Sequence, residues 1–576
     1  MKLREVTIHN VRSVKDVTLN LSGYSMLVGE NNVGKTNILT AIRLFYEDGG
    51  VKYKHDTDFP KFDTDDKESW VEFAFETDQD EQDSLKREYQ SVDRVLRVRK
   101  YFESENPDLV KTNQSNIYGY EAGELSKNLF YGAKNVSQAK IGKTIFIPAV
   151  SKTDDTLKLT GPSPFREMVN FVMKRAVMES QTFDVLKTAF DTFNTDFKDE
   201  VSKDGFSINA LIEDINLDIQ NWNVRFGVNL NPIQPEDIVK NLLSHYVEDI
   251  GLGGQQINLS SFGQGLQRHL IYTLIKLSAK YVVPSKAKKN DFDPDFTLLL
   301  FEEPEAFLHP SQQQSLHLNL RKLTTQASEQ VLISSHSPHF VSKQISEMEG
   351  IVRVQKNNGI TSSYQVTKEI FENILDENVG LYKKFCDCLI DPSIDVSVKN
   401  RIKKDKLGDD PPDEFSKLEE EALKYFLWLD SERSAMFFAK RVIICEGASE
   451  KIFLDYLIDE LWPEKRDDHL CFIDALGKYN IHRYMSLLTA LAIPHSVLMD
   501  GDENGGVHDI CNEFIQSKTT PFTHGVHIFK KDFEDFLGIS KPNRNDLKPL
   551  NVIVKYKNNE IPKTKLEELK VVIDTL

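Results

Sequence analysis

The chain has 576 residues, 40% of them hydrophobic and 28% charged, and its formal net charge is −18. This length and composition are typical of a soluble globular protein with about three or four domains. The negative charge disfavours a protein that coats nucleic acid nonspecifically, although a local basic groove or a metal-bridged phosphate contact stays compatible with it. No apolar run approaches the ~18 residues of a membrane span, so we expect no membrane association.

The five cysteines are scattered and odd in number, and none forms a Cys-x-x-Cys pair. They support neither a disulfide framework nor a zinc site. The first residues enter a strand pattern directly, so no signal peptide is expected. Together these features predict a protein of the reducing cytoplasm.

The first part of the chain alternates strand patterns with a glycine-rich loop and one helix. Strands are predicted at 5–10, 14–21, 25–28, 70–76, 94–102 and 144–148, and a helix at 37–46. Most of these strands alternate apolar and polar residues, as half-buried strands do. The polar stretches 50–70 and 103–140 are predicted to be rich in loops.

Residues 164–247 carry apolar residues at helical spacing, most clearly over 165–197 and 208–222. This spacing predicts a helical insertion with its own packing face. A lid or scaffold is the plainer interpretation, and a dimerisation element is the sharper one. Periodicity alone does not choose between them.

Beyond this insertion strands and helices alternate again, which predicts the α/β fold class. Helices are predicted at 264–279, 312–324, 449–461 and 481–492, and strands at 296–301, 330–334, 441–445, 471–475 and 496–499. The strand at 296–301 is apolar throughout, as expected in a parallel sheet covered on both faces. Residues 370–437 are predicted to be largely helical, with a domain joint at the break over 409–412.

Residues 29–36 read Gly-Glu-Asn-Asn-Val-Gly-Lys-Thr and fit the phosphate-binding pattern Gly-x-x-x-x-Gly-Lys-Thr. The glycines let backbone N–H groups approach a polyphosphate, and the following helix N-terminus favours negative charge. Lys35 would reach the β- and γ-phosphates, and Thr36 would hold Mg²⁺. The predicted ATP contacts of this segment are Gly29, Asn32, Gly34, Lys35, Thr36 and Asn37.

The apolar strand at 296–301 delivers two carboxylates, Glu302 and Glu303, at its C-terminal end, where an open α/β sheet places ligands. Glu302 would lie near Mg²⁺, in the place usually given to an aspartate. Glu303 would polarise the attacking water. A solvated turn is the competing interpretation of a Glu-Glu pair, and the phosphate loop disfavours it.

Residues 260–268 read Ser-Ser-Phe-Gly-Gln-Gly-Leu-Gln-Arg and open a helix, which suits phosphate binding. Residues 334–338, Ser-Ser-His-Ser-Pro, follow the next strand. The order of phosphate loop, insertion, glycine-rich segment, Glu-Glu strand and histidine resembles the ABC-type ATPases of the structural-maintenance-of-chromosomes type. The insertion is far too short for a long coiled-coil arm.

This resemblance implies roles for four further residues. Ser261 and Gly263 would belong to the signature segment, which acts on the nucleotide of a partner molecule. His336 would be the switch histidine at the γ-phosphate, and Arg12 the N-terminal arginine that approaches the nucleotide. The usual glutamine loop has no counterpart that we can place, so that contact is left open.

A second group of carboxylates follows two strands near the C-terminus. The strand at 441–445 ends in Glu446-Gly447-Ala448-Ser449-Glu450, and the strand at 496–499 ends in Asp500-Gly501-Asp502. The four carboxylates Glu446, Glu450, Asp500 and Asp502 predict a hard-oxygen site for Mg²⁺ or Mn²⁺. Metal ions held this way orient a water and stabilise the leaving oxygen in phosphodiester cleavage.

These two acidic motifs resemble those of the Toprim domain. Their combination with the ATPase motifs resembles the OLD (overcoming lysogenization defect) family of ATP-dependent nucleases over nearly the whole chain. The resemblance implies that Gly477 is the small residue between the motifs, and that Glu534, with Asp532 as a weaker candidate, is a further metal ligand. It also implies a catalytic lysine, matched by Lys548 with Lys555 as fallback, although a surface lysine is an equally open interpretation of Lys548.

The resemblance implies an ABC-type ATPase head with a helical insertion and a C-terminal, Rossmann-like Toprim domain. The implied borders are 1–163 and 248–372 for the two parts of the ATPase head, 164–247 for the insertion, 373–438 for a helical linker and 439–576 for the Toprim nuclease domain. The insertion is expected to be the dimerisation element.

The implied function is that of an ATP-regulated, divalent-metal-dependent DNA endonuclease with an antiphage role. A signature that acts in trans implies a homodimer or a tetramer, and some family members work with a partner protein or a retron RNA–DNA element. Two alternatives stay open: a non-cleaving ATP-dependent DNA clamp or repair protein, and a Toprim enzyme with topoisomerase or primase chemistry. Glu302 in place of aspartate leaves the rate of ATP hydrolysis open.

Overall fold

The structure, a computed structural model, describes most of the chain. The described residues are 1–149, 180–197, 200–222, 224–228, 246–257, 261–263, 266, 270, 273, 292, 294, 296–325, 329–341, 345–408, 429–502 and 506–576. The chain forms two compact units, one of Met1–Ala149 with Asp291–Leu576 and one of Val150–Asn290. Within the described ranges, no helix is both long enough and apolar enough to cross a membrane. The finer domain borders stay predictions.

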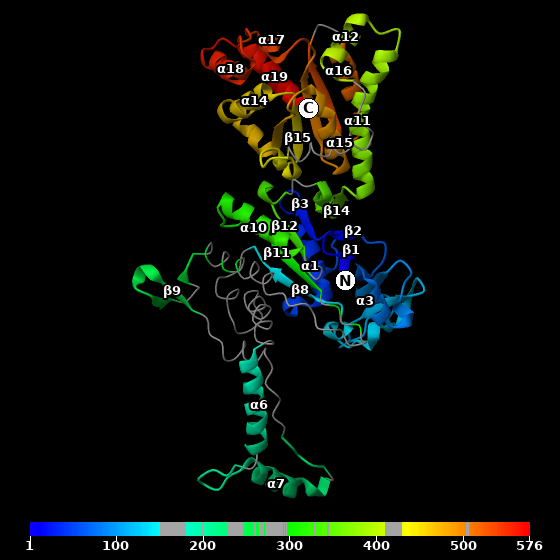
Figure 1. Cartoon of the computed structure of the whole chain (residues 1–576), viewed down its shortest axis with the longest axis vertical. Helices are drawn as coiled ribbons and strands as arrows, with labels where there is room; N and C mark the ends of the chain where they lie inside the picture. Colours follow the sequence, from blue (N-terminus) through cyan, green and yellow to red (C-terminus); the bar gives the residue numbers. More distant parts are fainter. Residues whose placement is uncertain are drawn as a thin grey trace. The chain divides into compact units, whose positions relative to one another are not determined.

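A 12-stranded mixed sheet organises the larger part of the first unit (Figure 1). Its strand order is β7-β6-β5-β4-β1-β2-β14-β13-β3-β12-β11-β8. The strands are β1 (Lys2–Val11), β2 (Val14–Asn20), β3 (Tyr24–Val28), β4 (Ser69–Glu76), β5 (Val95–Glu103), β6 (Ile117–Glu121), β7 (Glu124–Leu129), β8 (Lys143–Ile147), β11 (Thr297–Glu302), β12 (Glu329–Ser334), β13 (Ile351–Asn357) and β14 (Ile360–Gln365). Neighbours in this sheet therefore come from distant parts of the sequence.

One half of this sheet is parallel and carries the glycine-rich loop. Strands β8, β11, β12, β3 and β13 pair in parallel, and β3 is buried along its whole length. Because the strands point the same way, the segments that follow β3, β11 and β12 meet at one edge of the sheet. Helix α1 (Lys35–Tyr46) starts at that edge and packs Ile38, Ile42 and Phe45 into the core.

The other half is antiparallel and confirms the strands predicted at 5–10, 14–21, 70–76 and 94–102 as β1, β2, β4 and β5. The prediction that 103–140 is rich in loops is wrong in its middle, where β6 and β7 form a hairpin. Its turn residues Ala122 and Gly123 have φ of 51° and 88°, the left-handed conformations of a two-residue hairpin turn. Polar, mostly exposed β7 has no apolar alternation that marks a strand.

A second hairpin, β13–β14, brings residues 351–365 back into the sheet between β3 and β2. Its turn residues Asn358 and Gly359 have φ of 50° and 86°. The sequence analysis made no prediction for this hairpin. Its position places it directly against the loop that follows β3.

Besides α1, the described helices of this part are α2 (His55–Asp58), α3 (Gln79–Ser84), α10 (Pro310–Leu323), α11 (Lys368–Ile390) and α12 (Val396–Lys404). Residues 370–404 are therefore largely helical, as predicted. The predicted joint at 409–412 lies outside the described residues. Helix α11 packs on the C-terminal part of the chain, where Asn378 O lies 3.3 Å from His482 Nε2.

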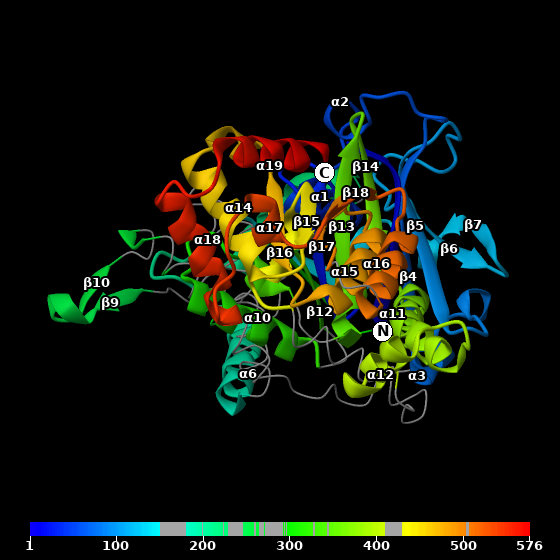
Figure 2. The same ribbon diagram turned by 90° about the horizontal axis from the view of Figure 1, so that it is seen from above.

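A separate four-stranded parallel sheet, of order β16-β15-β17-β18, lies near the C-terminus. Its strands are β15 (Arg441–Cys445), β16 (Leu470–Asp474), β17 (His495–Asp500) and β18 (Thr523–Phe529), and its helices are α14 (Ala448–Glu460), α15 (Ile481–Ala490), α16 (Val507–Ser517), α17 (Phe533–Leu537), α18 (Lys548–Lys557) and α19 (Lys563–Thr575). Figures 1 and 2 show α14, α18 and α19 to one side of this sheet, and α15 and α16 to the other. Apolar residues of α14, α17 and α19 share one core with this sheet.

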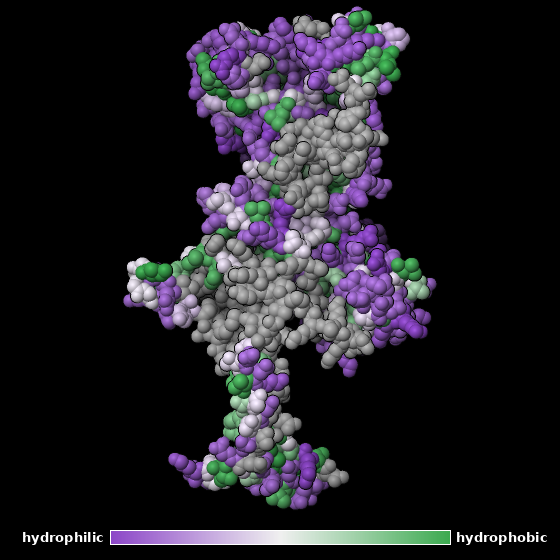
Figure 3. Space-filling view, viewed as in Figure 1, coloured by the Kyte–Doolittle hydropathy of each residue, from purple (hydrophilic) through white to green (hydrophobic). Residues whose placement is uncertain are grey.

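The second unit contains α6 (Gln181–Asp196) and α7 (Ile208–Ile219), which confirm helices within the predicted insertion. It exposes Leu211, Leu217 and Trp222, and Figure 3 shows hydrophobic residues mixed with hydrophilic ones on this part of the surface. Its role in dimerisation stays a prediction. The helix predicted at 264–279 lies almost wholly outside the described residues.

Candidate nucleotide site and candidate metal centre

The loop between β3 and α1 depends on its glycines. Gly29 and Gly34 have φ of 139° and 110°, in the left-handed region that favours glycine. A Cβ on Gly29 would lie 2.3 Å from Val354 O, and one on Gly34 would lie 2.2 Å from Thr361 Oγ1. The β13–β14 hairpin therefore packs so closely on the loop that no other residue fits at these two positions. Asn32, also at positive φ, lies at the tip of the loop.

A network of hydroxyl groups ties this loop to its neighbours. The Thr361 hydroxyl lies 2.7 Å from Ser13 Oγ and donates to Val33 O at 2.8 Å. Asn37 Nδ2 donates to Ser13 Oγ at 2.6 Å. Asn37 was predicted as a nucleotide contact, and its side chain amide here supports the loop. No local pattern marks Thr361, which lies far along the chain from Ser13.

Arg12 lies beside the N-terminal half of α1, and its approach to a nucleotide stays a prediction. Its Nε donates to Asp58 Oδ1 at 2.9 Å, and its guanidinium lies 3.3 Å from Thr40 Oγ1 and 3.5 Å from Asn37 Oδ1. Buried Asp58 was not predicted, and it fixes the direction of the arginine.

Lys35, Thr36 and Glu302 come together at the edge of the parallel strands. Lys35 Nζ donates to Gly29 O at 2.9 Å and to Glu30 O at 2.6 Å. Burial lowers the pKa of Lys35 to about 8, against the opposing charges of Glu303 and nearby glutamates. Thr36 Oγ1 donates to Glu302 Oε1 at 2.6 Å. The hydroxyl and carboxylate predicted to hold Mg²⁺ with ATP are thus neighbours, and their oxygens fit that ion.

The segment after β12 places His336 against Glu303. His336 Nε2 lies 3.5 Å from Glu303 Oε1, and Glu303 has a φ of 43°. Burial, with a smaller contribution from Lys35, lowers the pKa of His336 to about 4, so the imidazole is neutral at pH 7. A neutral imidazole beside a carboxylate can orient a water and a phosphate without adding charge.

Glu305 completes this edge and was missed by the sequence analysis. Its carboxylate accepts from the Ser335 hydroxyl at 2.9 Å and from the His336 N–H at 2.5 Å. Burial raises its pKa. The third acidic residue in Glu-Glu-Pro-Glu was the available signal.

Ser261 and Gly263 of the predicted signature segment lie in the second unit. Ser260, Gln264 and Gly265 lie outside the described residues. Contact of this segment with the nucleotide of a partner molecule therefore stays a prediction.

The C-terminal sheet brings two of the predicted carboxylates side by side. Strands β15 and β17 are parallel neighbours, and the Asp500 N–H donates to Glu446 Oε2 at 3.0 Å. A Cβ on Gly501 would lie 2.4 Å from Phe529 O, so the segment after β17 packs closely on the end of β18. Only glycine allows this approach, which sets Asp500 beside Glu446.

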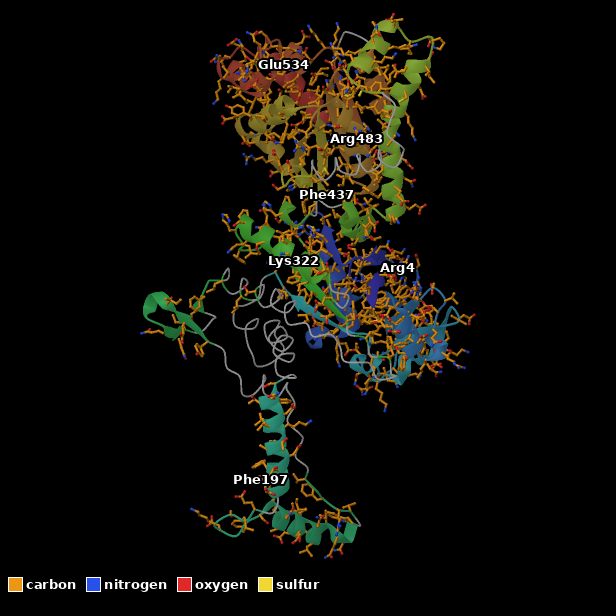
Figure 4. All side chains as sticks on the ribbon, viewed as in Figure 1. Arg4, Phe197, Lys322, Phe437, Arg483 and Glu534 are labelled. Carbon is orange, nitrogen blue, oxygen red and sulfur yellow. The ribbon has the colours of Figure 1, made fainter. Side chains whose placement is uncertain are left out.

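Glu450 and Glu534 join this pair from two helices. Glu450, buried in the first turn of α14, accepts from the Gly447 N–H at 3.2 Å. Glu534, labelled in Figure 4, lies on α17 and is 2% exposed. Among the described residues, its Oε1 is one of the few buried oxygens with no hydrogen-bond partner. The adjacent Phe533 N–H donates to Asp500 Oδ1 at 2.9 Å.

The carboxylates of this cluster oppose one another. Burial, then the charge of Asp500, raises the pKa of Glu450 to about 8. Burial, then the charge of Glu446, raises the pKa of Asp500 to about 7. Burial also raises the pKa of Glu446, while the positive charges of Lys478 and Lys548 oppose that rise. Such a group of buried acidic oxygens fits a hard divalent cation.

The predicted ligands are close together without yet surrounding one point. Of the described residues, no three acidic, histidine or cysteine side chains converge at metal-binding spacing. Asp502 instead accepts from Lys478 Nζ at 2.6 Å, and Glu446 accepts from a backbone N–H. Lys478 was not among the predicted site residues. It directly follows Gly477, whose N–H donates to Glu446 O at 2.9 Å.

The structure separates the remaining candidates. Lys548 begins α18 and acts electrostatically on Glu446, whereas Lys555 pairs with Glu560 at 2.5 Å. Asp532 caps α17 through the Asp535 N–H and pairs with Lys541 at 2.8 Å. Lys548 is therefore the better candidate for the catalytic lysine, and Asp532 has a structural role.

Two family models match the chain where these two sites lie. A model of the AAA ATPase domain matches residues 1–341, and a model of the Toprim domain of overcoming-lysogenization-defect-like proteins matches residues 437–502. The chain belongs to the AAA ATPase domain family and carries an OLD-like Toprim domain. The first match contains the phosphate loop, Glu302 and His336, and the second contains Glu446, Glu450, Asp500 and Asp502.

Three similar curated proteins carry nuclease names. The endonuclease GajA of Bacillus cereus strain VD045 is 23% identical, over 87% of this chain and 75% of its own. The Old nuclease of Escherichia phage P2 is 22% identical, over 87% and 77%. The OLD nuclease of Thermus scotoductus is 21% identical, over 87% and 82%.

Among solved structures, an SMC head bound to the C-terminal winged-helix domain of ScpA matches with a TM-score of 0.36. It is 14% identical and covers 64% of this chain and 99% of its own. The α/β fold of the ATPase head follows from its own strand order.

Proposed function

We propose that this protein is an ATP-regulated, divalent-metal-dependent DNA endonuclease of the OLD family. The observation that carries the proposal is the pairing of Glu446 with Asp500 at the carboxyl end of two parallel strands, beside the unpartnered oxygen of Glu534. The nuclease names of the three relatives support the same reaction and DNA as its substrate.

In this proposal Glu446, Glu450, Asp500, Asp502 and Glu534 hold Mg²⁺ or Mn²⁺. The bound ion supplies stabilisation of the negative charge that develops on a phosphodiester during hydrolysis. Lys548, at the start of α18, adds positive charge on the side of Glu446 and stabilises the same transition state.

The ATPase half controls this cutting. Lys35 binds the β- and γ-phosphates of ATP, and Thr36 with Glu302 holds its Mg²⁺. Glu303 orients the attacking water, and neutral His336 meets the γ-phosphate. Ser261 and Gly263 act on the nucleotide of a second copy, so the working form is a homodimer or a tetramer.

The proposed biological role is antiphage defence in the cytoplasm, with a partner protein or a retron RNA–DNA element as a further component. The name of the similar GajA endonuclease and the OLD-like Toprim match support a nuclease effector. Challenge of cells with phage, using wild type and Glu446→Gln, tests this role through survival.

Plasmid cleavage tests the biochemical function. We expect the full-length protein to cut with Mg²⁺ or Mn²⁺ and Glu446→Gln to lose at least about 100-fold in rate, as loss of a positioned charge at a reacting centre does. Lys35→Ala should keep cutting and lose its response to ATP. Exposed Glu513 on α16 gives the matched control Glu513→Gln, which should cut like wild type. Equal cutting by Glu446→Gln would overturn the assignment of this site.

A non-cleaving ATP-dependent DNA clamp is the competing function. The observation in its favour is that no three of the described carboxylates converge on one point. DNA that stays bound and intact with wild type, under every metal and nucleotide condition, would support the clamp. Cutting that is lost in Asp500→Ala while DNA binding persists would exclude it.

A further inference from the structure

Lys478 lies inside the carboxylate cluster, where a positive charge is unexpected for a metal site. Its side chain amine donates to Asp502 Oδ2 at 2.6 Å and to Asp500 O at 2.7 Å, and it lies 3.8 Å from Glu446 Oε2. The residue is 3% exposed. The ammonium group therefore touches two of the predicted ligands and the backbone of a third.

The turn after β16 positions the Lys478 side chain at the carboxylate cluster. Leu476 and Gly477 have φ of 58° and 105°, and this left-handed pair turns the chain back after β16. The Gly477 N–H is fixed on Glu446 O at 2.9 Å, so the turn is anchored to the acidic residue itself. Lys478 then starts a short 3₁₀ helix with its side chain buried against the end of β17.

We propose that the Lys478 ammonium is a resident cation of the nuclease centre, which occupies part of the edge formed by Glu446 and Asp502 and so displaces the divalent ion toward Glu450, Asp500 and Glu534. This inference rests on the proposed metal-dependent nuclease. Lys478 is a positioning residue, because it sets where the ion binds and does not itself touch the reacting phosphate.

The charges of the cluster explain how this works. The negative charges of Asp500, Glu446 and Glu534, in that order, act on Glu450, and Lys478 is not among the main groups that shift its pKa. Glu534 contributes the buried oxygen that lacks a hydrogen-bond partner. A divalent ion is therefore favoured on this side, whereas on the Glu446 side it must compete with an ammonium group already in hydrogen-bond contact.

Removal of the ammonium should strengthen metal binding. Lys478→Met keeps the length of the side chain and removes its charge, so the ammonium group no longer competes with a divalent ion for Glu446 and Asp502. We expect Mn²⁺ to bind at least about tenfold more tightly, because charges a few ångströms apart interact strongly at low exposure. A lysine that only braced the segment after β17 would give the opposite result, since its loss would loosen the ligands.

The experiment is calorimetric titration of Mn²⁺ into the full-length protein without nucleotide. Asp500→Asn reports binding elsewhere in the chain and is subtracted. Lys478→Arg, which keeps the charge, should bind like wild type. The matched control is Lys565→Met, since Lys565 on α19 pairs with Glu568 at 2.7 Å and is partly exposed, and it should change Mn²⁺ affinity less than about twofold.

The outcomes separate two failures. If wild type binds Mn²⁺ and Lys478→Met binds it equally or more weakly, the resident-cation proposal is overturned while the nuclease proposal stands. If wild type and Asp500→Asn bind Mn²⁺ alike, both are overturned. If Lys478→Met does not fold, the double variant Lys478→Met/Asp502→Asn removes both charges of the pair and should still bind one ion on the Glu450 side; loss of that ion would refute the proposal.

Discussion

The Glu305 carboxylate accepts a hydrogen bond from the His336 backbone N–H at 2.5 Å and a second one from the Ser335 hydroxyl. The histidine is thus positioned through its main chain by a residue that follows the Glu-Glu pair. We predict that Glu305→Ala lowers the rate of ATP hydrolysis about 10- to 100-fold, because a displacement near 1 Å at a reacting centre costs that much. ATP affinity should stay within about twofold, since binding rests mainly on the phosphate loop.

Steady-state hydrolysis and fluorescent-ATP binding measure the two effects separately. Glu305→Gln is the matched variant, because the amide oxygen can still accept one of the two hydrogen bonds, and it should keep more activity than Glu305→Ala. A change confined to ATP affinity would show that Glu305 supports nucleotide binding instead.

Thr361 should control the affinity for ATP although it lies 348 residues from Ser13, its hydroxyl partner. Thr361→Val keeps the shape of the side chain and removes the hydrogen bonds to Ser13 and Val33. Two such bonds are worth about 1 kcal/mol each and about 2 kcal/mol together, so we predict about 30-fold weaker ATP binding. Ser363→Ala on the same strand, away from the loop, should bind ATP like wild type. Equal binding by both variants would contradict the bracing role.

Gly501→Ala should disable the nuclease centre without removing any ligand. The new methyl group would lie 2.4 Å from Phe529 O, so the backbone of Asp500 and Asp502 must move. We predict loss of plasmid cleavage with DNA binding retained, and a loss of stability of roughly 1–3 kcal/mol from overpacking. In Gly525→Ala the closest atom is the tip of the Leu576 side chain at 3.0 Å, which can move, so activity should persist. Full cleavage by Gly501→Ala would contradict this geometry.

His317 should make the ATPase half sensitive to acid. It is buried, its Nδ1 lies 3.1 Å from Tyr24 Oη, and burial lowers its pKa to about 4. As the pH falls below about 6.5 the unfolded chain takes up this proton first, so folding stability decreases between pH 7 and pH 4. At pH 5 the loss from this residue is about 2 kcal/mol.

Urea denaturation at pH 7 and pH 5 measures the difference. His317→Gln can keep a hydrogen bond to Tyr24 and cannot titrate, so its stability should fall about 2 kcal/mol less than that of wild type over this range. His524→Gln removes an exposed histidine and should behave like wild type. An unchanged pH dependence in His317→Gln would mean that the buried ring is not the group responsible.

The parts of both sites that a local pattern marks were predictable. Glu302, Glu446 and Asp500 each lie at the carboxyl end of an apolar strand predicted from the sequence. Because parallel strands place their carboxyl ends at one edge, Glu446 and Asp500 were expected to lie close together in their sheet. The phosphate loop was equally clear, because its glycine spacing is a property of a single segment.

The supporting residues were not predictable, because their partners are remote in sequence. Thr361 belongs to a hairpin that enters the sheet beside β3, and no residue near Ser13 indicates that this hairpin will pack there. Lys478 lies 22 residues before the backbone oxygen of Asp500 that it contacts. In each case the side chain reads as an ordinary polar residue until the strand order is known.

The place of β3 in the sheet has a consequence for how the protein is made. Tyr24–Val28 is completed early in synthesis, yet both of its neighbours, β12 and β13, come from beyond residue 328. A nascent chain must therefore carry this strand, which is fully buried in the folded protein, unpaired while the whole second unit emerges, and exposed strand edges promote aggregation during that period. A shortened chain that stops at residue 341 would keep one edge of β3 open for good, whereas one that extends past Gln365 would include the β13–β14 hairpin and supply the missing neighbour.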